Sequence, residues 1–113
     1  MYLTLKVPSS QVNHKGKEDI KVEVDINWVT AGKVTPVGTQ GQCGSSWAFS
    51  STGSIESLYM IEKGLKEVDL SEQDLIDCTS AYGNAGCFGG GLMSNCFRYV
   101  SEKGVHEEKD YPY

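Results

Sequence analysis

The chain has 113 residues and a mass of 12.3 kDa, so it accommodates at most one domain of ordinary size. Its hydrophobic fraction of 39% allows a core and excludes a disordered tail. Ten basic residues against fifteen acidic ones give a net charge of −5, which argues against nucleic acid or an anionic membrane as a partner. No run approaches the roughly 18 apolar residues of a membrane span.

The first residues predict an extended leader. Residues 1–8 (M-Y-L-T-L-K-V-P) have no basic start and too short an apolar stretch for a signal peptide. Residues 9–23 are polar and show no helical periodicity, which favours a tail or linker. Val22, Val24 and Ile26 then alternate with polar neighbours, a pattern that allows a short strand.

A loop rich in glycine and proline, residues 32–44, leads into a predicted helix that begins near Ser45 or Ser46. Its inward face is indicated by residues at helical spacing: Ala48, Thr52, Ile55 and Tyr59, and likewise Ser51, Ile55 and Leu58. Small residues between 50 and 54 let other elements approach closely. We therefore expect a largely buried helix.

A second helix has a clearer start. Ser71 is a good N-cap residue, Asp74 stands at the third position of a capping box, and Leu70 and Leu75 can form a hydrophobic staple. This helix should end near Cys78. Residues 80–91 read as a loop with little regular structure. A third helix is predicted from about Leu92 to Lys103, stopped by Gly104, with Met93, Cys96, Phe97 and Val100 as its apolar face.

The segment Gln40 to Ser50 carries the chemistry. It delivers Ser46 to the first turn of a helix, where unpaired backbone N–H groups and the helix dipole stabilise an anion. The side-chain amide of Gln40 can add a second donor, which suits an oxyanion formed by a nucleophile at position 46. The simpler interpretation makes Ser46 an ordinary N-cap serine.

The sequence of this segment resembles that of the papain and cathepsin family of cysteine proteases, nearest the cathepsin L type. The family signature C-G-[SA]-C-[WY] is matched by Cys43 to Trp47, with Ser46 where the family has its catalytic cysteine. Further motifs resemble those of the family: Asn27-Trp28, V-T-P-V at 34–37, L-S-E-Q at 70–73 with Asp77-Cys78, G-C with three glycines at 86–91, and Y-P-Y at 111–113. One extra residue stands near Phe88.

The resemblance implies an α+β papain-like fold, of which this chain would supply mainly the helical left domain without the β-rich right domain. It implies an oxyanion hole made of the Gln40 side chain and the Ser46 backbone N–H. The implied substrate-binding residues are Gly44, Ser45, Trp47, Gly90, Gly91, Leu92 and Met93. Gly90 and Gly91 would present backbone to an extended peptide, and Leu92 and Met93 an apolar pocket.

Residues 1–22 would be the C-terminal part of a propeptide that blocks the cleft, and residues 23–113 the helical domain. A disordered leader would look the same. The family's catalytic histidine and asparagine follow the cysteine by about 130–150 residues, beyond the 67 that follow Ser46. We expect neither His14 nor His106, the latter in a surface turn, to replace them, so the chain as written is expected to be inactive.

The resemblance also implies a Cys43–Cys87 disulfide, and a partner for Cys78 after Tyr113 in the missing half. Cys78 and Cys96 are then free thiols here, the rival being a Cys78–Cys96 bond. Expected partners are a peptide or protein substrate in the cleft and the chain's own propeptide, with no cofactor and no metal. The family is lysosomal or secreted. Ser46 is either an exchange made to trap a proenzyme or natural, as in testin-like binding proteins or silicatein-like serine variants.

Overall fold

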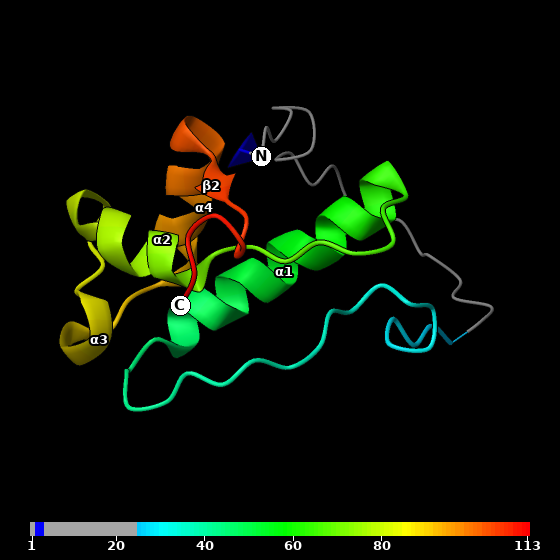
Figure 1. The fold of residues 1–113 in the computed structure, drawn as a ribbon, viewed down its shortest axis with the longest axis horizontal. Helices are drawn as coiled ribbons and strands as arrows, with labels where there is room; N and C mark the ends of the chain where they lie inside the picture. The colour runs from blue at the N-terminus through cyan, green and yellow to red at the C-terminus, as the bar shows by residue number, and fades with distance from the viewer. Residues whose placement is uncertain (1, 4–24) are drawn as a thin grey trace, which may run out of the picture.

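The computed structural model describes residues 2–3 and 25–113. Its longest element is helix α1 (Ser46–Lys63), and the short helices α2 (Glu72–Cys78), α3 (Gly86–Gly89) and α4 (Met93–Lys103) gather at one end of it (Figure 1). The segment before α1 runs back along that helix. Lys33 Nζ donates to the Met60 carbonyl at 3.2 Å, and Thr35 Oγ1 donates to Glu56 at 2.7 Å.

Helix α1 begins at Ser46, as predicted, and its last helical residue is Lys63. Gly64 follows as the C-cap in the left-handed region (φ 64°), which glycine adopts without strain. Its predicted inward positions Ala48, Ser51, Thr52, Ile55 and Tyr59 are buried. Leu58 was expected on that face and is instead 39% exposed. The buried hydrophobic core is made of Trp47, Ala48, Ile55, Tyr59, Met60, Val68, Leu70, Leu75, Cys96, Tyr99, Val100 and Val105.

The start of α2 agrees with the predicted cap. Ser71 Oγ accepts a hydrogen bond from the Asp74 backbone N–H at 2.9 Å, and the staple residues Leu70 and Leu75 are fully buried. The reciprocal half of the capping box does not form, because the Ser71 N–H donates to the His106 carbonyl instead. The Asp74 carboxylate is thereby released to contact other elements.

Helix α4 spans Met93–Lys103, close to the predicted range, and the Gly104 N–H donates to Val100 to close it. Cys96 and Val100 are fully buried and Phe97 packs against the core, as expected. The expected inward position of Met93 is wrong, since this side chain is 42% exposed at the first turn. Tyr99 takes a place in the core that the apolar pattern did not predict.

Three other expectations change. Residues 80–91 are not an irregular loop, because they contain a short 3-10 helix, η2 (Ser80–Tyr82), and α3. His106 lies not in a surface turn but in strand β2 (Val105–His106), which pairs antiparallel with β1 (Tyr2–Leu3). Residues 25–27 have no regular structure and Ile26 is 66% exposed, so no strand reaches it. Val22, Val24 and the leader residues 4–21 lie outside the described residues.

Across residues 2–3 and 25–113, no helix is both long and apolar enough to cross a membrane.

The cap of α2 should be a measurable contribution to stability. Replacing Ser71 with alanine removes the acceptor for the Asp74 N–H together with the hydroxyl that donates to the Tyr111 carbonyl, and is expected to lower the free energy of unfolding by about 1–2 kcal/mol. The control is Ser54→Ala in α1, which removes only an exposed bond to the Ser50 carbonyl and should stay within about 0.5 kcal/mol of the parent. Urea unfolding followed by circular dichroism measures both, and equal effects would contradict the assignment of the cap.

Candidate active site

The first turn of α1 presents two serines in opposite environments. Ser45 occupies the N-cap position and is fully buried, whereas Ser46 is the first helical residue and is exposed. The interpretation of Ser46 as an N-cap is therefore wrong. The first turn holds no acidic side chain, so the partial positive charge at the start of this 18-residue helix is not offset from within it. Ser46 thus stands exposed where an anion is stabilised.

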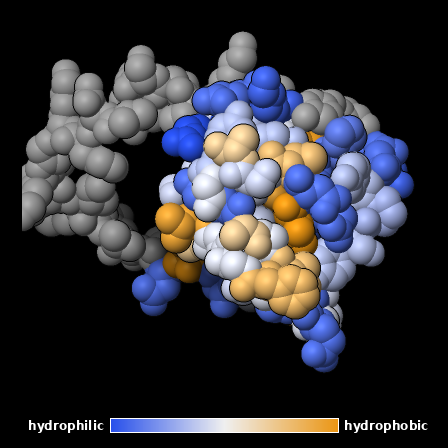
Figure 2. All heavy atoms as spheres, turned by 90° about the vertical axis from the view of Figure 1, so that its left-hand side faces the viewer, coloured by the Kyte–Doolittle hydropathy of each residue, from blue (hydrophilic) through white to orange (hydrophobic). Residues whose placement is uncertain are grey.

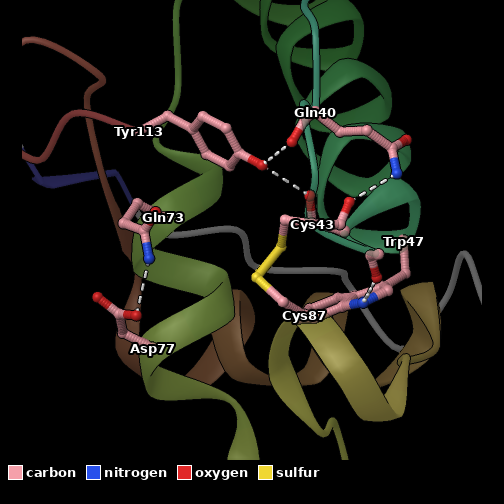
Figure 3. The surroundings of a disulfide bond; sticks show 9 residues. Gln40, Cys43, Trp47, Gln73, Asp77, Cys87 and Tyr113 are labelled. Atoms are coloured by element: carbon pink, nitrogen blue, oxygen red, sulfur yellow. Dashed lines mark hydrogen bonds between the residues drawn. A yellow bond between two sulfur atoms is a disulfide. The ribbon is translucent and has the colours of Figure 1, made fainter.

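Gln40 precedes this turn on the extended segment that approaches α1. Its Nε2 donates to the Cys43 carbonyl at 2.8 Å, which fixes the side-chain amide across the loop (Figure 3). An amide nitrogen carries two protons, so one donor remains after this bond. Gln40 thus lies in the loop that precedes Ser46 with its side-chain amide held by this intraloop bond, and its role as an oxyanion donor stays a prediction.

A disulfide joins this loop to α3. Cys43 and Cys87 are bonded, which confirms the predicted pairing, while Cys78 is an exposed free thiol and Cys96 a buried one. The Gly44 N–H donates to the Cys87 carbonyl at 2.9 Å beside the disulfide. A Cβ on Gly44 would lie 2.6 Å from that carbonyl oxygen, so only glycine allows this approach. The loop before Ser46 is therefore fixed laterally to residues 86–89.

Trp47 joins the same loop to the glycine-rich segment. Its indole Nε1 donates to the Gly44 carbonyl at 3.0 Å, and the side chain is only 4% exposed. A Cβ on Gly91 would lie 2.6 Å from Trp47 Cδ2 and 2.8 Å from Asn84 Oδ1. Trp47 was expected to bind substrate, but the structure gives it a buried role as the packing surface for Gly91.

Asn84 packs against Gly91, which together with Gly90 forms the pair that we call the glycine wall, although the sequence gave no reason to single it out. It is 4% exposed, its Nδ2 donates to Thr79 Oγ1 at 2.9 Å, and its Oδ1 accepts from the Leu92 N–H at 2.9 Å. A second bond comes from Asn95 Nδ2 at 3.0 Å. Because both the amide nitrogen and the amide oxygen of Asn84 are hydrogen-bonded, this buried side chain fixes residues 79–92 relative to one another. The sequence pointed to this role only through the position of an asparagine between glycines.

Beyond Gly91 the surface is apolar and open. Phe88 is 100% exposed, Leu92 60% and Met93 42%, and Gly90 has φ 74°, a conformation that other residues rarely adopt. The face that carries α3 shows hydrophobic side chains among hydrophilic ones (Figure 2). Leu92 and Met93 thus lie on an exposed surface next to the glycine backbone, where an apolar pocket was expected.

An acidic cavity of about 340 Å³ borders the segment that leads to Gln40, and its carboxylate lining consists of Glu56, Glu67, Asp69, Glu72 and Glu108. Burial raises the pKa of Glu72 to about 7, with smaller contributions from the neighbouring carboxylates, against hydrogen bonds that lower it. Burial likewise raises the pKa of Glu56, which accepts hydrogen bonds from Thr35 and from the Leu70 N–H. The oxygen Oε2 of Glu108 is buried without a hydrogen-bond partner.

Comparison with known proteins decides which family this arrangement belongs to. Residues 22–113 match the model of the papain family of cysteine proteases. The chain belongs to the papain family. It is 53% identical over 89 residues to Cathepsin L1 of Drosophila melanogaster, covering 78% of this chain and 24% of that protein. The papain-family chain therefore spans about a quarter of the length of this relative.

Solved structures agree with this assignment. The digestive procathepsin L 3 of the Tenebrio molitor larval midgut superposes with a TM-score of 0.72 at 48% identity, covering 78% of this chain and 28% of that one. Procathepsin L2 from the same source gives 0.75 at 43% identity, covering 84% and 30%. The papain-family chain is thus cathepsin L-like, and its largely helical structure corresponds to part of the papain-like fold.

The close approach at Gly91 can be tested by adding one methyl group. Gly91→Ala places a Cβ against Trp47 and Asn84 and is expected to destabilise the chain by about 1–3 kcal/mol. The matched control, Gly53→Ala in α1, has open space at its Cβ and should be stabilising by about 0.5–1 kcal/mol. The urea midpoints of unfolding measure both effects. An unchanged midpoint for Gly91→Ala would mean that Trp47 and Asn84 move to make room for the methyl group.

The acidic cavity predicts a pH dependence of stability. The pKa of Glu72 is about 7 in the folded chain, above the ordinary glutamate value of 4.5, so the folded state holds the proton more tightly. Its contribution is fully present below pH 4.5 and is lost as the pH rises through about 7. The melting temperature of the parent should therefore fall across this window.

Glu72→Gln should reduce the fall of the melting temperature with rising pH. The remaining fall is due to Glu56 and Asp69, whose pKa values are also raised by burial. Glu62→Gln, an exposed carboxylate on α1, is the control and should keep the parent's slope. A Glu72→Gln profile parallel to that of the parent would contradict the assignment.

Proposed function

We propose that this chain is the N-terminal, helical part of a cathepsin L-like peptidase precursor whose nucleophile position is occupied by Ser46. The observation that carries the proposal is the joint placement of Ser46, Gln40 and the glycine wall. Ser46 is exposed at the first turn of α1, Gln40 bonds to the loop before it, and Gly91 packs on Trp47. This combination suits attack on a peptide carbonyl.

Each of these residues would have a separate role on a bound peptide. An extended peptide lying along Gly90 and Gly91 would bond to their backbone, with Leu92 and Met93 offering apolar contact to one of its side chains. Attack by the atom at position 46 moves negative charge onto the carbonyl oxygen. The Ser46 backbone N–H and the remaining Gln40 amide proton would stabilise that charge as the acyl-enzyme forms.

Turnover also needs a base, and within residues 2–3 and 25–113 the one histidine lies elsewhere. His106 belongs to the junction of α2 and β2, where its Nδ1 lies 2.9 Å from Asp74 Oδ2. A serine hydroxyl is far less acidic than a thiol, so it does not form the thiolate–imidazolium pair on which the family depends. We therefore propose that the chain is inactive as written, and that a histidine from outside these residues serves the parent enzyme.

Residues 1–22 would be the end of a propeptide, and a lysosomal or secreted destination would follow. The match to the family model begins at residue 22, and the two similar solved structures are proenzymes. The backbone of β1 pairs with β2, with Tyr2 opposite His106, so the start of the leader contacts the domain. Residues 4–24, including His14, lie outside the described residues.

A second candidate is a peptide-binding protein without turnover, favoured by the serine at position 46. A serine-dependent hydrolase of the silicatein-like kind is a third. These two candidates differ from the peptidase in the effect expected of a cysteine at position 46. Only in a peptidase would the other catalytic groups be in place for that thiol to act on a peptide.

The deciding variant is Ser46→Cys in the full-length protein, with Ser46→Ala as the matched control. We expect Ser46→Cys to hydrolyse a fluorogenic peptide at least about a thousandfold faster than either the Ser46 form or the alanine control. It should also be labelled by an epoxide that reacts with thiolates. No turnover and no labelling would reject the peptidase in favour of the binding protein, whereas turnover by the Ser46 form would favour the serine hydrolase.

A further inference from the structure

The phenol of Tyr113 connects Gln40 with the residue that precedes Ser46. Its hydroxyl donates to the backbone carbonyl of Gln40 and lies 3.1 Å from the hydroxyl of Ser45 (Figure 3). These contacts span 73 and 68 residues of sequence. We propose that Tyr113 is a positioning residue that sets the two oxyanion donors, the Gln40 amide and the Ser46 N–H, relative to each other.

The direction of the two hydrogen bonds follows from the number of protons. A phenol has a single proton, and the Gln40 carbonyl can only accept it. Ser45 must therefore donate its own proton to the Tyr113 oxygen. The N-cap hydroxyl of α1 is thus withdrawn from the helix it precedes, which agrees with the absence of a side-chain cap at Ser45.

The ring of Tyr113 is held on its other sides. It packs edge-on against Phe49, with ring centroids 5.0 Å apart and planes at 74°. Phe49 has this position because Gly38 has no side chain, since a Cβ there would lie 2.9 Å from the Phe49 ring. The Tyr113 N–H donates to Glu108 Oε1 at 2.8 Å. The position of the Tyr113 hydroxyl is therefore set by the packing of its ring and by its backbone hydrogen bond.

Both ends of Gln40 are then restrained. Tyr113 holds its backbone carbonyl, and the Cys43 carbonyl holds its side-chain amide at 2.8 Å. Through Ser45, the same phenol restrains the residue immediately before the Ser46 N–H. Removing the hydroxyl would leave the ring packing in place and free the relative position of the two donors. This inference rests on the proposed function only for what the donors do.

The first test uses the chain with Ser46 as it stands. Tyr113→Phe should speed amide hydrogen exchange in peptides that cover residues 40–48 by about fivefold to tenfold, as expected for losing a restraining hydrogen bond. Peptides from α4 should be unchanged. The matched control is Tyr111→Phe, which removes a phenol two residues away that donates to Asp77 at 2.6 Å. Equal exchange of residues 40–48 in all three proteins would overturn the proposal.

The second test measures catalysis in the full-length Ser46→Cys protein. Tyr113→Phe should lower kcat about tenfold with KM within about twofold, because it acts on donors used in the transition state. Inhibition by a peptide aldehyde, which forms a tetrahedral adduct, should weaken by the same factor, and binding of the matching peptide amide should not. Tyr111→Phe should keep the parent's values.

The two tests separate the two ideas. An active Ser46→Cys protein whose Tyr113→Phe variant keeps kcat and aldehyde affinity overturns the positioning role and leaves the proposed peptidase intact. A Ser46→Cys protein with no activity rejects the peptidase, while hydrogen exchange still decides whether Tyr113 fixes the loop. A loss of both kcat and peptide amide binding would indicate general disruption and count against a specific role.

Discussion

The carboxylate of Asp74 lies where three elements of this domain meet. It is 1% exposed and accepts hydrogen bonds from the Tyr99 hydroxyl of α4 at 3.0 Å and from the His106 N–H of β2 at 2.8 Å, while its own helix is α2. The His106 ring adds a contact at 2.9 Å. A buried carboxylate is tolerated only when it is so satisfied, which makes the relative positions of these elements strict.

The site depends on this junction through a short path of chain. β2 leads directly into residues 107–113, whose turn is closed by the Tyr111 N–H bond to the Glu107 carbonyl at 3.2 Å. The Glu108 N–H donates to the Asp69 carbonyl at 2.9 Å and so joins this segment to the residues before α2. That turn ends at Tyr113, which contacts Gln40 and Ser45. Through Tyr113, the loop before Ser46 is thereby connected to the junction of α2, α4 and β2.

Sequence reasoning succeeded where a local pattern determines the structure. The cap at Ser71, the staple of Leu70 and Leu75 and the stop at Gly104 each depend on neighbours within a few residues, and each is present. The Cys43–Cys87 pairing came from family resemblance, because spacing alone does not select one pairing among four cysteines. The proposed roles of Ser46, Gly90 and Gly91 also came from that resemblance and stay predictions.

The errors and omissions are of the opposite kind. Helical periodicity placed Leu58 and Met93 inward, but whether another element covers a position is decided by tertiary packing. Asn84 bonds to residues 5 to 12 positions away, and Tyr113 to residues 68 and 73 positions away. Neither set of contacts follows a helical periodicity or a cap pattern, so local rules did not identify these residues. The capping box at Asp74 predicted a local bond, and the carboxylate formed longer-range contacts instead because α4 and β2 offered buried donors.

The Cys43–Cys87 bond closes a loop that contains the whole of α1 and α2, whereas α4 and β2 lie outside it. The Asp74 junction, by contrast, joins elements from inside and outside that loop by hydrogen bonds and contains no disulfide. The loop before Ser46 is thus held both by a covalent bond and, through Tyr113, by this hydrogen-bonded junction. Reducing this one bond would remove the covalent link between α3 and the Ser46 loop while leaving the Asp74 hydrogen bonds in place. The lateral hold of α3 on the loop before Ser46 therefore depends on the oxidised Cys43–Cys87 pair, whereas the contacts of Asp74 do not.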